Sequence, residues 1–231
     1  MRGFLTSARE HPSAVLLAAQ LLAVLAYPFL EGSPGGRAFV GVVQIAIVLI
    51  ALAAVRRTPT LTWVAVVFVP PAMVFSVLEA ISPDNGAIVL GSALFHVPFY
   101  FFVSYAMIRY LFHDDRVTRD ELYATGAAFT VVAWGFAYVY AAAQVVWPES
   151  FAGIDGVGEQ TWFELLFLSF TTLTSVGLSD VTPVASHARS LVMVEQVAGV
   201  FYVALVVARL IGLARPRVVE VHSPDEPGQR S

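Results

Sequence analysis

Long apolar runs separated by short polar stretches dominate the chain. An α-helix rises about 1.5 Å per residue, so about 20 apolar residues cross the hydrocarbon core of a bilayer. The pattern predicts six transmembrane helices at residues 12–30, 38–55, 60–80, 86–112, 122–147 and 187–213. The third helix contains Pro70-Pro71, which we expect to kink or split it, because proline removes a backbone donor.

Composition agrees with a membrane protein. The chain is 58% hydrophobic and 13% charged, with a mean hydropathy of +0.74, whereas about a quarter of the residues in a soluble domain are charged. A net charge of -4 without a basic face argues against nucleic-acid binding. The absence of cysteine excludes disulfides and thiolate chemistry.

The basic residues predict the orientation. All 13 are arginines, and with six spans only Arg37 and Arg189 fall on the side opposite to the rest. Arginine gathers on the cytoplasmic side of a membrane. We therefore expect a multi-pass protein of the cell membrane with both termini cytoplasmic.

A seventh apolar segment, Trp162 to Leu173, lies between the fifth and sixth predicted helices. As a helix it would measure roughly 18 Å, which is too short to span a bilayer. Such a re-entrant helix is tolerated where the backbone that follows is buried in protein or lines water. The segment therefore predicts a pore.

The residues after this segment carry a motif, Thr174-Ser175-Val176-Gly177-Leu178-Ser179-Asp180. It resembles the T-T-V-G-Y-G-D pore loop of the potassium-channel superfamily, and the resemblance covers about residues 160–213, closest to prokaryotic channels with a two-helix pore module. Independently of the family, a dehydrated cation needs a ring of oxygen ligands, which inward-pointing backbone carbonyls can supply. Glycine at position 177 permits the left-handed backbone that such a ring requires.

The resemblance implies a role for each residue of this region. It places an ion-binding filter at residues 174–179, and it implies that K⁺ is coordinated by the carbonyls of Ser175, Val176, Gly177 and Leu178. Support for the filter would come from Thr171, Asp180 and Glu195, and Gly199 would be a gating hinge. From the residues alone, close helix packing explains Gly199 equally well, and Glu195 could brace the pore helix instead of contacting ions.

Two residues depart from the family pattern. Leu178 replaces the usual tyrosine, so the phenolic hydrogen bond that commonly anchors the filter to its surroundings in the family is absent. Ser179 replaces the second glycine of the motif. A left-handed residue with a side chain costs about 1–2 kcal/mol. We therefore expect strain at Ser179 and weaker selectivity for potassium over sodium.

The complete prediction is an all-α integral membrane protein that forms a homotetrameric cation channel conducting potassium. It assigns residues 1–115 to a four-helix transmembrane domain, 116–215 to the pore domain and 216–231 to a cytoplasmic tail. Residues 86–108 lack the arginines of a voltage sensor. We expect no enzymatic activity, no cofactor and no regulatory subunit; alternatives are a weakly selective cation channel or a subunit of a potassium uptake transporter.

Overall fold

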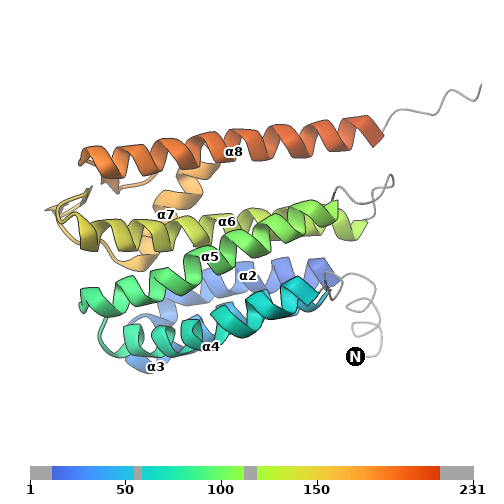
Figure 1. Cartoon of the computed structure of the whole chain (residues 1–231). Coiled ribbons are helices and arrows are strands. Elements are labelled where there is room, and N and C mark those ends of the chain that lie inside the picture. Colours follow the sequence, from blue (N-terminus) through green and yellow to red (C-terminus); the bar gives the residue numbers. More distant parts are fainter. Residues whose placement is uncertain (1–11, 55–58, 112–118, 214–231) are drawn as a thin grey trace, which may run out of the picture.

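Long helices lying side by side make up most of the molecule (Figure 1). The computed structural model describes residues 12–54, 59–111 and 119–213. Its helices are α2 (Pro12–Leu30), α3 (Pro34–Ala54), α4 (Pro59–Ile81), α5 (Gly86–Leu111), α6 (Arg119–Val146), α7 (Trp162–Leu173) and α8 (Ser186–Leu213). The connections at residues 31–33, 82–85 and 147–161 lie at one end of the bundle, which we call the loop end.

Each of the six predicted spans falls on one long helix, and the re-entrant segment forms α7. Among the described residues, five helices are long and apolar enough to cross a membrane: Ser13–Leu30, Trp63–Ile81, Gly86–Arg109, Asp120–Val146 and Ser186–Arg209. Helix α4 continues through Pro70 and Pro71, so it is not split. Neighbouring helices allow proline inside membrane helices.

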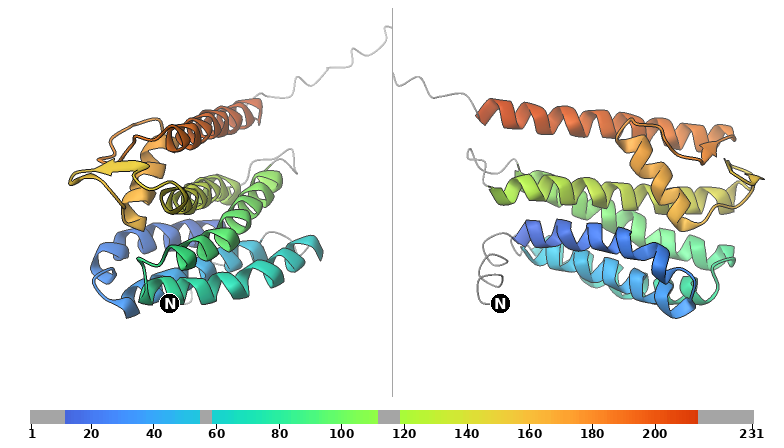
Figure 2. Two further views of the ribbon diagram at one scale, coloured as in Figure 1. Left: turned by 60° about the vertical axis from the view of Figure 1, so that its left-hand side comes forward. Right: turned by 180° about the vertical axis from the view of Figure 1, so that it is seen from behind.

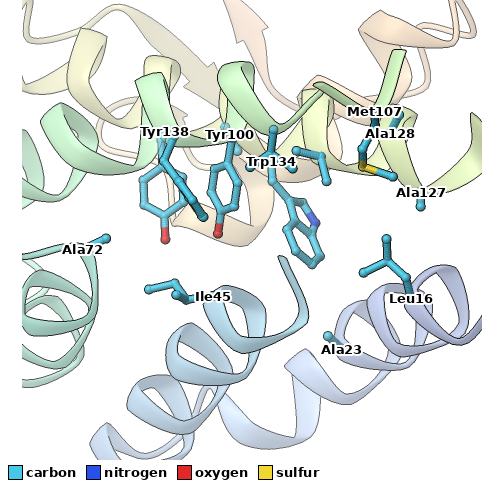
Figure 3. Packing of buried hydrophobic residues seen from close by; sticks show 14 of the residues in the cluster. Leu16, Ala23, Ile45, Ala72, Tyr100, Met107, Ala127, Ala128, Trp134 and Tyr138 are labelled. Atoms are coloured by element: carbon cyan, nitrogen blue, oxygen red, sulfur yellow. The ribbon is translucent and has the colours of Figure 1, made fainter. Parts of the chain in front are cut away.

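The hydrophobic core lies where α5 and α6 pack against the first three helices. Tyr100 and Trp134 are fully buried, and with Tyr138 they point toward the side where Ile45 and Leu16 lie (Figure 3). The same core includes Leu166 of α7. The first three helices and α7 therefore share one packing unit with α5 and α6.

A small antiparallel sheet departs from the all-α prediction. Strand β1 (Phe151–Gly153) pairs with β2 (Gly156–Val157) and with β3 (Thr182–Pro183). In the second pairing Ala152 lies opposite Thr182. The sheet therefore ties the chain before α7 to the chain after the predicted filter.

Helix α8 lies at the edge of the molecule, and α7 runs between it and α6 (Figure 2). Much of the surface of α8 is apolar and exposed, including Met193, Val197 and Phe201. An apolar helix face of this kind suits lipid or another protein chain.

Candidate functional site

The start of α7 is fixed by hydrogen bonds on both sides of its first turn. The Thr161 hydroxyl accepts from the backbone N–H of Glu164 (3.3 Å), and the Glu164 carboxylate accepts from the Thr161 N–H (2.7 Å), which together form a capping box. Just before it, the side-chain amide of Gln144 on α6 donates to the Gln160 carbonyl (2.9 Å) and accepts from the Gln160 N–H (3.0 Å). Helix α7 therefore enters the bundle at a defined position.

After α7 the backbone reverses direction within four residues. Thr174 remains right-handed, with φ -80° and ψ -7°, whereas Ser175 and Gly177 are left-handed, with φ of 59° and 69°. The N–H groups of Val176 and Gly177 both donate to the carbonyl oxygen of Thr171, each at 3.0 Å. Thr171, predicted to support the filter, thus does so through its backbone oxygen.

This arrangement separates donors from acceptors in residues 174–179, which we call the filter segment. The backbone N–H groups of Ser175, Val176 and Gly177 donate hydrogen bonds to carbonyl oxygens in the last turn of α7. Across the described parts of the chain, the carbonyl oxygens of residues 174–178 receive no hydrogen bond. The side chains of Val176 and Leu178 are 58% and 72% exposed, so the segment is also open to partners outside the chain. Free carbonyls on an exposed backbone are suited to bind cations.

The expectation that Ser179 has a strained, left-handed backbone is wrong. Among the described residues, the left-handed positions that are not glycine are Glu149 and Ser175. The Ser179 hydroxyl instead accepts a hydrogen bond from the backbone N–H of Val181 at 3.0 Å. Ser179 therefore serves as a turn residue, and within the filter segment the left-handed position that carries a side chain is Ser175.

Glu195 connects three helices behind the filter segment. Its buried carboxylate is hydrogen-bonded to the hydroxyl of Tyr140 on α6 and to that of Ser169 on α7. The Ser169 hydroxyl also lies 2.9 Å from the carbonyl oxygen of Ala133. These contacts favour bracing over ion contact. The sequence reasoning missed Tyr140 and Ser169, although a serine inside the apolar run of α7 signals a polar partner.

Gly199 packs against the backbone at the end of α7. A Cβ atom added there would lie 2.2 Å from the carbonyl oxygen of Leu173. Close packing therefore explains the glycine, whereas a hinge stays a prediction, because α8 passes through this position as one helix. The side chain of Asp180, the third predicted support, is exposed at the surface.

Three exposed acidic residues, Glu149, Asp155 and Glu159, lie in the connection at the loop end, and the exposed Asp180 directly follows the filter segment. Within the described ranges, no three histidine, aspartate or glutamate residues form a group that could hold a metal ion. The acids can therefore attract cations only as a diffuse field.

Comparison with known proteins points to the same region. A family model described as "Ion channel" matches residues 126–215, which include most of α6, α7, the filter segment and α8. No curated protein and no solved structure matches the chain. The resemblance that the pore-loop motif suggested is thereby supported: residues 126–215 of this chain are similar to the ion-channel family.

Proposed function

We propose that four copies of this chain form a channel that conducts K⁺ down its gradient through the carbonyls of Ser175, Val176, Gly177 and Leu178. The observation that carries this proposal is the separation of donors and acceptors in the filter segment. The N–H groups of Ser175, Val176 and Gly177 donate to the carbonyls of Thr171 and Thr172, whereas within the described chain the carbonyl oxygens of the filter segment from 174 to 178 receive no hydrogen bond. A cation that loses its hydration shell requires such ligands.

The electrostatics of α7 also favour a cation. The carbonyl end of a helix carries a partial negative charge of roughly half an elementary charge. Helix α7 ends at Leu173, directly before the filter segment, and Glu164 in its first turn complements the opposite end. The exposed acids at the loop end would raise the local cation concentration.

A tetramer follows from the need to surround the ion. One filter segment supplies ligands from a single side, and closed rings of identical subunits are the usual route to a central axis. The exposed apolar side chains of α8, including Met193, Val197 and Phe201, offer surface for such contacts. The transporter alternative would instead require several unequal pore loops in one chain.

We place the protein in the cell membrane with six spans, cytoplasmic termini and the loop end outside. Arg37 and Arg189 begin helices at the loop end, whereas Arg109 and Arg209 lie toward the opposite ends of theirs. This distribution fits the positive-inside rule. Eight arginines of the prediction lie outside the described residues: Arg2, Arg9, Arg56, Arg57, Arg116, Arg215, Arg217 and Arg230.

Recordings from purified protein in planar bilayers test the proposal. With K⁺ on one side and Na⁺ on the other, we expect discrete current steps and a reversal potential displaced toward the potassium equilibrium potential. Native mass spectrometry should give four chains per particle. A reversal potential near zero would indicate the weakly selective alternative, and uptake without current steps from a one- or two-chain particle would indicate a transporter.

A further inference from the structure

A second polar site lies at the loop end, away from the filter segment. A cavity of about 410 Å³ opens between the first helices and the start of the pore helix. Tyr27 of α2 and Glu79 of α4 line one part of it, and Tyr138 of α6 and Trp162 of α7 line another. Its volume falls within the range of small-molecule sites, about 300–1,000 Å³.

The charged groups of this cavity are mainly acidic. Four carboxyl side chains line it, from Glu31, Glu79, Asp84 and Glu159, against the single guanidinium of Arg37. That guanidinium already donates to backbone oxygens, from Nη1 to the Glu31 carbonyl and from Nη2 to the Ala80 carbonyl, each at 2.9 Å. The cavity therefore suits a positively charged occupant.

Among the four acids that line the cavity, Glu79 is the one that lies within a long apolar helix. It lies within α4 near its loop end and is partly buried. Among the described residues, no ion pair neutralises its carboxyl group. An acid inside a membrane helix without a basic partner points to a functional role.

Aromatic rings form the wall beside these carboxyl groups. Trp162 lies between two tyrosines, with ring centroids 5.6 Å from those of both Tyr27 and Tyr138. Its indole Nε1 is buried, and no hydrogen-bond partner is found for it in the described chain. Aromatic faces next to carboxylates recognise organic ammonium groups, whereas the described residues contain no cluster suited to a metal ion.

We propose that this cavity binds a small organic ammonium ion. The Glu79 carboxyl group pairs with the cationic head, and the rings of Tyr27, Tyr138 and Trp162 contact its alkyl groups. Binding at this site does not depend on ion conduction, because no residue of the filter segment lines the cavity. Because its walls come from the first helices and from the beginning of α7, an occupant would strengthen their attachment to the pore helix.

The test measures binding of choline to the full-length protein by isothermal titration calorimetry in lipid nanodiscs. Potassium-rich buffer keeps the proposed filter occupied, so that binding there does not contribute. The control ligand is 3,3-dimethylbutan-1-ol, which has the shape of choline without its charge. We expect saturable binding of choline and affinity at least about tenfold lower for the neutral alcohol.

Matched variants locate the site. Glu79→Gln should weaken choline binding by at least about tenfold, whereas Glu149→Gln, at an exposed acid outside the cavity, should leave it unchanged. Gly177→Ala, which we expect to lose conduction because the filter backbone is left-handed there, should still bind choline, which distinguishes this proposal from channel function. Equal affinity for choline and the alcohol in wild type, no saturable binding, or unchanged affinity in folded Glu79→Gln would each overturn the proposal.

Discussion

Gly177 and Ser175 determine the local path of the filter segment. Both have a left-handed backbone, which costs glycine little but costs a residue with a side chain about 1–2 kcal/mol. The motif predicts the first position. The motif could not predict the left-handed backbone of Ser175. That conformation occurs together with the hydrogen bonds from the N–H groups of Val176 and Gly177 to the Thr171 carbonyl, and no residue type in the motif indicates these bonds.

Gly177→Ala is predicted to abolish conduction while the protein still folds and inserts. A Cβ atom at this position meets nothing within 4 Å in the chain, so the cost is backbone strain of about 1–2 kcal/mol. That strain would turn the neighbouring carbonyls. Bilayer currents and size-exclusion profiles of wild type and Gly177→Ala check this prediction. Normal currents from Gly177→Ala would show that ions do not pass along this segment.

The two departures from the family motif should respond differently to reversion. Leu178→Tyr is predicted to sharpen selection of K⁺ over Na⁺, because a phenol hydroxyl can anchor the filter laterally. Ser179→Gly should not, because it removes the acceptor of the Val181 N–H and relieves no left-handed strain. Reversal potentials in the same lipid compare the variants; a larger gain from Ser179→Gly would contradict this explanation.

At the scale of elements, apolar length was enough to predict the helices. The six long apolar runs and the short one correspond to the seven helices of the described residues, because lipid requires satisfied backbone groups over a fixed thickness. The continuous path of α4 through Pro70 and Pro71 was not certain from sequence, because it depends on neighbours. The sheet was missed because β1, β2 and β3 have only three, two and two residues, too few to show an alternating pattern.

Gly199→Ala distinguishes packing from a hinge. The added methyl group would meet the Leu173 carbonyl, and overpacking of this kind typically costs about 1–3 kcal/mol. We predict a lower midpoint of thermal unfolding for Gly199→Ala, with α8 displaced from α7. Unchanged thermal stability together with altered opening would instead support a gating hinge.

At the scale of the molecule, the pore region and the preceding helices share a core. Trp134 of α6 and Leu166 of α7 belong to the same buried cluster as Leu16 and Ile45. Their division into domains at residue 115 is a prediction from sequence alone. The partners of the exposed face of α8 could not be predicted either, because apolar surface suits lipid and protein alike.

Conduction is predicted to lack steep voltage dependence. Helix α5 carries arginine only at Arg109, in its last turn, whereas voltage sensing requires several charges that move through the membrane field. A conductance–voltage curve measured in bilayers should therefore be shallow. A steep sigmoidal curve would mean that charged groups outside α5 move through the membrane field during opening.

The central claim is that ions pass along the filter segment. The chain contains no cysteine, so a single cysteine can be placed at Leu178, which is 72% exposed, or as a control at Ile154, which is 85% exposed at the loop end. Both variants are treated with a positively charged methanethiosulfonate reagent during bilayer recording, and labelling is verified by mass spectrometry. Our account predicts that current through Leu178→Cys stops and returns after reduction, while wild type and Ile154→Cys are unaffected. Undiminished current through fully labelled Leu178→Cys would contradict it.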